Sequence, residues 1–320
     1  MNNSFNLVPY SKDRIKDLHY LFKLVHGINY SEERLSKKYD TSWSDYKIIG
    51  SFAYDLKTGE PVGFYGGFPI CFINRKLEKK LFFQAIDLVT HPKYRNQGLF
   101  ILNAMHTEEQ AKKMGIELFF SFPNKNSYHG FFNKLKLEKI GKWSIFTVQI
   151  TNLKIYGLCH KNPFLTRLYN LRWNNILKKY QLTENDWRKL VQLYIERLGE
   201  NYSVQVTVEY LKYKENYSTA GWIKYGGIFL FVKKDNGLNI GDLLFDKEKV
   251  DLVPLIINLG KKLLVNRITI TSSPNHPLTS ILSGYNYFSK IDGGDIGVKF
   301  CLPVPKTYNV AFTLSDSDDF

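Results

Sequence analysis

A short apolar strand followed by a basic, glycine-containing turn and a long helix is the feature that most limits what this chain can fold into. Residues 82–89 form a largely apolar run of strand length. Pro92 cannot donate to a strand ladder, so the strand must end just before it. From Leu99 onward apolar residues recur at helical spacing, and Gly115 follows as a C-terminal stop. The sequence therefore predicts a helix that starts at or just after Gly98.

The start of this helix has the properties of a phosphate-binding site. The first backbone N–H groups of a helix have no partner within it, and the aligned peptide dipoles place partial positive charge at that end. Gly98 lacks a Cβ, which allows close approach to the backbone, and Arg95 adds a permanent cation. A pyrophosphate fits such a helix end. The alternative is an ordinary strand-to-helix turn that carries a surface arginine.

The residues of this turn resemble a known motif. Residues 88–92 (Leu-Val-Thr-His-Pro), followed by Arg95, Gly98 and Phe100, are similar to the acyl-CoA binding motif of the GNAT superfamily of N-acyltransferases, Arg/Gln-x-x-Gly-x-Gly/Ala. Phe100 stands where the family has a small residue. The resemblance implies that coenzyme A, as acyl-CoA, is bound by Leu88, Val89, Thr90, Arg95, Asn96, Gln97, Gly98, Leu99 and Phe100. With Asp87 before it, the stretch looks most similar to bacterial GNAT proteins of surface-polysaccharide pathways.

The resemblance also implies how an acyl transfer would be catalysed. In the family a backbone N–H on the strand before the phosphate turn polarises the thioester carbonyl, and here it would be that of Leu88 or Val89. Asp87 is an isolated acid in an apolar strand, so it needs a partner or a role. It is either the base that takes the proton of the attacking amine or a structural acceptor for nearby amides. His91 is the second candidate base.

The next strand and helix complete the expected CoA site. Residues 116–122 have the pattern of a strand, and a polar break precedes a helix over 128–135. In the family this strand splays from the one before it, and the gap admits the pantetheine arm of CoA. Asn124 and Ser127 would then face CoA, although both residue types are also favoured as helix caps.

The general acid for the departing thiolate is less clear. In many family members it is a tyrosine about one turn into this helix, but Phe131 and Phe132 occupy that neighbourhood here. The acid is therefore absent, or it is Tyr128 or His129.

The predicted elements of the first half follow the order of a GNAT fold. A strand over 5–10 precedes two helices, the first opened by Ser11 and the second capped by Ser31. Three antiparallel strands, a helix, a strand, a helix and a strand follow. The three strands are predicted over 47–55, 61–73 and 80–89. This order implies an α/β (α+β) architecture with a central, mostly antiparallel, splayed sheet, and an acyl-CoA binding catalytic domain over residues 1–150.

The pattern restarts in weaker form in the second half, and 320 residues are too many for one GNAT fold. Residues 151–182 are predicted to be a helical connection, residues 183–310 a degenerate GNAT-like domain, and residues 311–320 a C-terminal tail. In the second domain we expect helices over 183–198, 207–213, 252–265 and 277–282, and strands over 221–233, 238–245, 267–272 and 297–302.

The second domain lacks the phosphate turn. Residues 246–251 read Asp-Lys-Glu-Lys-Val-Asp, with no glycine and with three acids that would repel a pyrophosphate. We therefore expect that this domain does not bind CoA and that it forms the other wall of the acceptor site.

Composition adds a few limits. The formal charge of +14, from 44 Lys and Arg against 30 Asp and Glu, suits polyanionic partners such as CoA and a nucleotide-linked substrate. The charge is spread along the chain without a nucleic-acid motif, so nucleic acid is not an expected partner. Three distant cysteines predict no disulfide framework and fit a cytoplasmic protein. We expect no membrane insertion, because no apolar run could span a bilayer, and no metal, because the histidines lack ligand spacing.

These inferences combine into one predicted function. The chain is expected to be an acyl-CoA-dependent N-acyltransferase that acylates the amino group of a nucleotide-linked amino sugar by direct attack in a ternary complex. The resemblance suggests a dTDP-linked 3-amino-3,6-dideoxyhexose of O-antigen or capsule (lipopolysaccharide) biosynthesis, with an acetyl group or a larger acyl such as 3-hydroxybutanoyl. The alternatives are an aminoglycoside or peptide N-acyltransferase and a non-enzymatic basic protein that binds nucleotides or nucleic acid.

Overall fold

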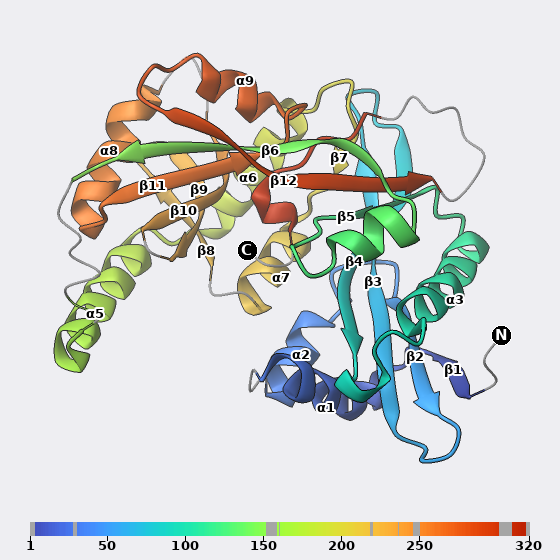
Figure 1. The fold of residues 1–320 in the computed structure, drawn as a ribbon. Helices are drawn as coiled ribbons and strands as arrows, with labels where there is room; N and C mark the ends of the chain where they lie inside the picture. The colour runs from blue at the N-terminus through green and yellow to red at the C-terminus, as the bar shows by residue number, and fades with distance from the viewer. Residues whose placement is uncertain are drawn as a thin grey trace. The chain divides into compact units, whose positions relative to one another are not determined.

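The computed structural model describes residues 4–27, 31–151, 159, 161–217, 220–235, 237–245, 250–300 and 309–317 (Figure 1). The chain forms two compact units, each made of segments that are distant in the sequence. The first unit comprises Met1–Ile73, Leu77–Gly141 and Gly294–Tyr308, and the second comprises Asn74–Lys76, Lys142–Gly293 and Asn309–Phe320. The expected division into consecutive domains at residue 150 differs from this arrangement, because two strands pass from one unit to the other.

The sheet of the first unit has the strand order β1-β2-β3-β4-β5-β12. Neighbouring strands are antiparallel except β4 and β5, which are parallel. The strands are β1 Phe5–Pro9, β2 Ile49–Asp55, β3 Pro61–Ile73, β4 Lys79–Thr90, β5 Leu118–Ser121 and the end of β12 Ser289–Phe300. The helical elements are η1 Lys12–Arg14, α1 Ile15–His26, α2 Glu32–Lys38, η2 Pro92–Tyr94, α3 Leu99–Lys113 and the π-helical turn η3 His129–Lys134.

Helix α3 is the crossover that two parallel strands require, and it packs on the sheet through small side chains. Ala104 and Ala111 are fully buried in a cluster that includes Phe83 of β4 and Phe119 of β5, whose rings lie 4.6 Å apart between centroids. Burying these aromatic rings supplies much of the free energy that holds α3 against β4 and β5. The strand-turn-helix segment predicted from the sequence is therefore anchored in the core of the first unit.

Two long strands exchange their ends between the units. β6 Glu138–Gln149 starts in the first unit, but its residues Ser144–Gln149 pair with β11 of the second. β12 starts in the second unit, but its residues Gly297–Phe300 pair antiparallel with β5 of the first. The expectation that residues 297–302 complete the second domain is therefore wrong for the residues described, because these residues extend the sheet of the first unit.

The second unit repeats the strand pattern of the first. Its sheet has the order β6-β11-β10-β9-β8, with β10 and β11 parallel and the other pairs antiparallel. The strands are β7 Ser203–Val204, β8 Gly221–Tyr225, β9 Ile228–Lys234, β10 Leu238–Leu244 and β11 Arg267–Ser272. The helices are α5 Pro163–Lys179, α6 Glu184–Glu196, α7 Val208–Tyr217, α8 Leu252–Leu263, α9 Pro277–Ser283 and η4 Leu314–Asp316.

The stretch over residues 221–233 is two strands, not the single strand expected. Gly226 and Gly227 have φ values of 57° and 89°, and the chain reverses there between β8 and β9. A two-residue hairpin turn with two positive φ angles favours glycine at both positions. The apolar pattern on both sides concealed this turn, although the Gly-Gly pair signals it.

The helical connection and the tail are parts of the second unit. Tyr169 and Trp173 of α5 are buried in its main core cluster, with 5% and 1% of their surfaces exposed. Phe312 is fully buried, and its amide donates to Ser273 Oγ at 2.8 Å. Among the described residues no helix is both long enough and apolar enough to cross a membrane.

Candidate active site

The turn before α3 has the shape of an anion site. Asn96 and Gly98 both have left-handed backbone conformations, with φ values of 63° and 80°. Arg95 before them is extended, with φ −64° and ψ 158°, so the backbone changes direction over these residues as it enters the helix. Arg95, Asn96, Gln97 and Gly98 are exposed, so a ligand can reach this turn.

The first backbone N–H groups of α3 are not used by a side-chain cap. Gly98 is the N-cap residue, and no side chain caps the helix there. The first amide that bonds back within the helix is that of Leu102, which donates to the Gly98 carbonyl at 3.1 Å. The amides of Leu99, Phe100 and Ile101 therefore precede the helical ladder, at the end with partial positive charge. A pyrophosphate group fits this donor set, and the nearby Arg95 guanidinium adds a cation.

Phe100 is accommodated without blocking the turn. Its ring packs edge-on against Phe131 at 5.7 Å between centroids and lies 6.1 Å from the ring of Tyr65, within the core cluster. Gly130 makes room for the ring, since a Cβ added there would lie 2.5 Å from Phe100 Cε1. The large side chain at this motif position is thus directed into the core, and a glycine compensates for it.

The strand before the turn separates from its parallel neighbour. β5 pairs with β4 only from Phe82 to Gln84, although β4 continues to Thr90. The later part of β4 thus has one edge without the β5 partner. This divergence is the splayed arrangement expected for a slot that admits the pantetheine arm.

Leu88 directs its N–H to that open edge. The amide of His91 donates to the Val62 carbonyl of β3 at 2.9 Å, and Val62 lies directly opposite in the register. Bonding directions alternate along an antiparallel strand, so the N–H of Val89 faces β3 and that of Leu88 faces away from it. Of the two amides considered from the sequence, the geometry favours Leu88 as the donor to a thioester carbonyl.

Asp87 follows a bulge in β4 and is held by two partners. Asp87 pairs with Gly66 and Ala85 with Gly67, which leaves Ile86 as an extra residue. Lys38 Nζ lies 3.0 Å from each carboxylate oxygen of Asp87, and Tyr39 Oη donates to Oδ2 at 2.5 Å. Both oxygens are engaged, which matches the structural reading of Asp87 more closely than that of a free base.

His91 is a capping residue. Its ring is 6% exposed, and Nδ1 accepts a hydrogen bond from the Lys93 amide at 3.1 Å. The lone pair that a base would use is thus occupied by the turn itself.

Tyr128 and His129 have different surroundings. Lys139 Nζ donates to Tyr128 Oη, and this hydrogen bond raises the pKa of Lys139. A phenol that accepts from an ammonium keeps its own O–H to donate. His129 is exposed, and its Nδ1 lies 2.8 Å from Asn133 Nδ2. Of the two candidates for the general acid, Tyr128 has the more suitable environment.

Asn124 and Ser127 form a local turn. Asn124 Oδ1 accepts from the amides of Asn126 and Ser127 at 2.9 and 3.1 Å, and Ser127 Oγ accepts from the Asn124 amide at 3.1 Å. The capping alternative thus accounts for their side chains.

Lys38, Tyr39, Lys139 and Gly130 were not singled out from the sequence. Their roles depend on contacts between distant segments, and only the glycine before two phenylalanines left a local signal.

Comparison of the sequence with models of protein families gives no match, and comparison with curated proteins gives none either. Solved structures do match. A probable N-acyltransferase from Enterococcus faecalis V583 has a TM-score of 0.65 at 11% identity, with 93% of this chain and 73% of that chain covered.

Two further structures match over similar lengths. A GCN5-related N-acetyltransferase from Kribbella flavida has a TM-score of 0.61 at 12% identity, with coverage of 92% and 71%. N-myristoyltransferase of Saccharomyces cerevisiae with bound myristoyl-CoA has a TM-score of 0.55 at 12% identity, with coverage of 94% and 79%. The chain therefore has the mixed α/β fold of the GCN5-related N-acetyltransferases, with a second, degenerate copy of that fold.

Proposed function

We propose that the protein is an acyl-CoA-dependent N-acyltransferase. The observation that carries this proposal is the uncapped N-terminus of α3, with Gly98 at φ 80° and Arg95 exposed beside it. An acyl-CoA brings a pyrophosphate, which such a helix end binds, and a thioester, which the divergent edge of β4 can receive. The fold shared with acyltransferase structures is consistent with this activity.

In this proposal, different residues of the first unit bind acyl-CoA, stabilise the developing charge and protonate the leaving group. The amides of residues 98–101 and Arg95 bind the pyrophosphate, and the Leu88 N–H donates to the thioester carbonyl oxygen, where negative charge develops. Tyr128 donates a proton to the departing sulfur, and the attacking nitrogen releases its proton to water, from which the phenolate of Tyr128 regains one. Asp87 holds α2 against β4 through Lys38 and Tyr39. Direct attack by an amine positioned beside Leu88 needs no covalent enzyme intermediate.

For the acceptor we propose a nucleotide-linked amino sugar in the cytoplasm. The support is the similarity of residues 87–100 to bacterial GNAT proteins of surface-polysaccharide pathways and the net charge of +14, which suits a polyanionic acceptor. The contribution of the second unit to the acceptor site remains an expectation from the sequence. Residues 246–249, where that unit lacks the phosphate turn, lie outside the described residues.

A thiol-release assay tests this function. The full chain is offered acetyl-, 3-hydroxybutanoyl- and myristoyl-CoA against dTDP-amino sugars, free amino sugars, aminoglycosides and short peptides. We expect free thiol and amide to form in equal amounts only with a nucleotide-linked amino sugar. Turnover confined to a peptide or an aminoglycoside would overturn the acceptor assignment, and absence of acyl-CoA binding would overturn the activity.

A further inference from the structure

Helix α5 of the second unit presents an apolar face to solvent (Figure 1). The first half of the helix exposes four large apolar side chains by 43% to 67%, namely Phe164, Leu165, Leu168 and Leu171. In the part of the chain that the structure describes, no other helix or strand exposes more than two such side chains. Phe164, Leu168 and Leu171 have the i, i+4, i+7 spacing of one helix face. The four side chains therefore form one continuous apolar surface.

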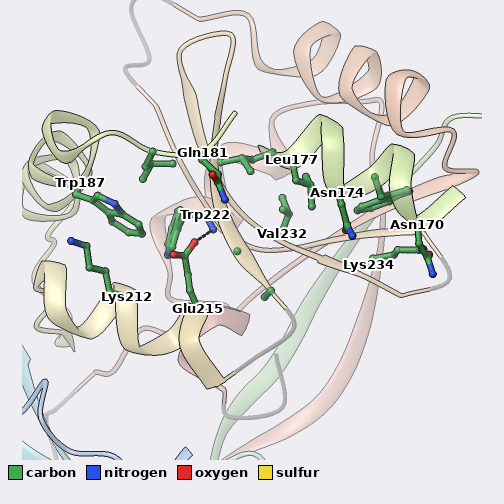
Figure 2. Close-up of a pocket in the computed structure, with 15 residues that line it drawn as sticks. Asn170, Asn174, Leu177, Gln181, Trp187, Lys212, Glu215, Trp222, Val232 and Lys234 are labelled. Carbon is green, nitrogen blue, oxygen red and sulfur yellow. Dashed lines mark hydrogen bonds between the residues drawn. The ribbon is translucent and has the colours of Figure 1, made fainter. Parts of the chain in front are cut away.

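The opposite face of α5 attaches the helix to its own unit. Tyr169 and Trp173 are buried in the main core cluster of that unit. Asn174 and Leu177 line a cavity together with Val232 of β9 (Figure 2). The packing of the second unit thus uses the face with Tyr169 and Trp173, and it leaves the apolar surface around Leu168 without a role in the fold.

The charge along α5 is entirely positive. The sequence has no acidic residue between Glu138 and Glu184, a stretch that contains the whole helix. The exposed cations of the helix are Arg167, Arg172, Lys178 and Lys179. Lys178 follows Leu171 by seven residues, so the basic end of the helix continues the face that is apolar at its start.

The C-terminal end of α8 extends this positive region. Arg172 Nη2 donates to the Lys262 carbonyl at 3.0 Å, which joins the middle of α5 to the last turn of α8. Lys261 and Lys262 are both exposed there. Hydrogen bonds with the Tyr180 and Tyr225 hydroxyls raise the pKa of Lys262, so this side chain stays a cation. The apolar face of α5 is thus bordered by cations from two helices.

Apolar and basic side chains on one exposed helix face match an anionic lipid surface. The phosphates of such a surface attract Lys and Arg, and its acyl boundary takes up the apolar side chains of a helix that lies in the interface plane. A nucleic acid would pair with the cations but leave Phe164 and the three leucines in water. A second copy of this chain would bring the cations of two such faces together.

We propose that α5, with the end of α8, docks the protein on an anionic lipid bilayer. Phe164, Leu165, Leu168 and Leu171 enter the boundary between headgroups and acyl chains, and the cations contact lipid phosphates. The helix lies on the bilayer and does not cross it. This surface is separate from the proposed acyl-CoA site, which consists of residues of the first unit.

Sedimentation with vesicles tests the proposal, using the full chain without acyl-CoA or acceptor. One set of vesicles is phosphatidylcholine alone, and the other contains about 30% phosphatidylglycerol as the anionic lipid. We expect saturable binding to the anionic vesicles that is at least tenfold tighter than binding to the neutral ones. Absence of saturable binding to the anionic vesicles would overturn the proposal.

An apolar double variant separates docking from simple adsorption of a chain with a net charge of +14. Phe164→Gln with Leu168→Gln keeps every charge, and we expect it to weaken binding to anionic vesicles at least tenfold. Ile195→Gln with Tyr287→Gln is the matched control, because both residues are apolar, more than half exposed and in the same unit. Binding that the α5 pair leaves unchanged, or that both pairs weaken equally, would contradict the assignment.

A charge double variant tests the basic end of the helix. Lys178→Gln with Lys179→Gln should weaken binding to anionic vesicles at least fivefold and leave binding to neutral vesicles unchanged. Arg188→Gln with Lys189→Gln removes two exposed cations of α6 and is the control, which should have a smaller effect. Equal weakening by both pairs would contradict the assignment.

Other partners for this face give different results. Self-association of the chain, or binding of duplex DNA or of an acidic peptide, that the Phe164 and Leu168 pair abolishes while vesicle binding persists would overturn the proposal. Because acyl-CoA and acceptor are absent, failure to bind vesicles leaves the proposed acyl transfer untouched, and failure of the acyl transfer leaves the docking surface untouched.

Discussion

The two units share a structural device that the sequence does not reveal. In the first, the bulge at Ile86 of β4 is followed by Asp87, held by Lys38 and Tyr39 from the end of α2. In the second, Gly241 is the extra residue of β10, and it is followed by Asp242.

The partners of Asp242 match those of Asp87 in kind. Arg197 binds both oxygens of Asp242 at 2.8 and 2.9 Å, and Tyr194 Oη donates to it at 2.6 Å, both from the end of α6. An aspartate after a bulge, fixed by a cation and a tyrosine at a helix end, thus occurs in both copies of the fold.

The units differ at the helix that follows this strand. Gly98 is the N-cap of α3, whereas Asp251 is the N-cap of α8 and places a carboxylate at that helix end. The aspartate cluster occurs both in the unit proposed to bind the pyrophosphate and in the unit for which no such binding is proposed. Features common to both copies therefore belong to the scaffold, and features confined to one copy are the better candidates for chemistry. We therefore assign Asp87 to the scaffold and keep Gly98 as the proposed pyrophosphate site.

The largest expected effect comes from breaking the cluster of the second unit. Asp242 is 1% exposed, so Asp242→Ala leaves the Arg197 charge buried without its partner. We expect a loss of about 3–5 kcal/mol in the free energy of unfolding. Urea denaturation followed by tryptophan fluorescence measures it, since four of the five tryptophans belong to this unit. The exposed Asp235→Ala is the control, and equal losses in both variants would contradict the account.

The second effect is a pH dependence confined to the second unit. Burial, with the nearby Arg197 charge, lowers the pKa of His276 from 6.5 to about 3. The unfolded chain therefore binds a proton at this histidine between pH 3 and 6.5 that the folded chain does not, so the contribution of His276 to stability rises with pH across this window. Burial raises the pKa of Asp316 from 3.8 to about 7, which contributes a slope of opposite sign, so the effect of His276 is read from the difference between the variant and the unaltered chain.

The slope from His276 should be about 1.4 kcal/mol per pH unit. His276→Asn keeps an acceptor for the Leu278 amide and should flatten that slope, whereas the exposed His26→Asn should not. An unchanged slope in the His276 variant, measured by urea denaturation from pH 4 to 7, would contradict the assignment.

A smaller effect is expected for Asp87, which tests the comparison itself. Its carboxylate and Lys38 are more accessible than the cluster of Asp242, with 11% and 15% of the side chains exposed. Asp87→Asn should lower the stability of the first unit by about 1–3 kcal/mol. It should change kcat less than threefold. A catalytic base would instead give a 100-fold or larger loss of kcat with near-normal melting.

The helix caps and strand bounds that depend on a few neighbouring residues could be predicted from the sequence. Ser31 caps α2, Thr183 and Asp186 form the capping box of α6, and β3 spans the predicted range Pro61–Ile73. The turn at Gly98 was also accessible, because proline, glycine and helical periodicity act over a few residues.

What the sequence could not show depends on distant pairing. The apolar pattern of β12 fits either sheet, so its pairing with β5 was not predictable. Cutting the chain at residue 150 would remove that strand from the first unit, which is why the full chain is needed in every experiment. The partners of Asp87, 48 and 49 residues away in the chain, left no local pattern.

The most direct test compares two glycines at opposite ends of one helix. Gly98 and Gly115 flank α3 with φ values of 80° and 75°, and an added Cβ meets no atom within 4 Å at either position. Alanine at either position should lower the free energy of unfolding by about 1–2 kcal/mol, because a residue with a Cβ is disfavoured in the left-handed conformation. Calorimetric titration of the full chain with CoA should show saturable binding that Gly98→Ala weakens at least tenfold and Gly115→Ala leaves unchanged. No binding of CoA, or equal weakening by both variants, would contradict the assignment of the α3 N-terminus as the pyrophosphate site.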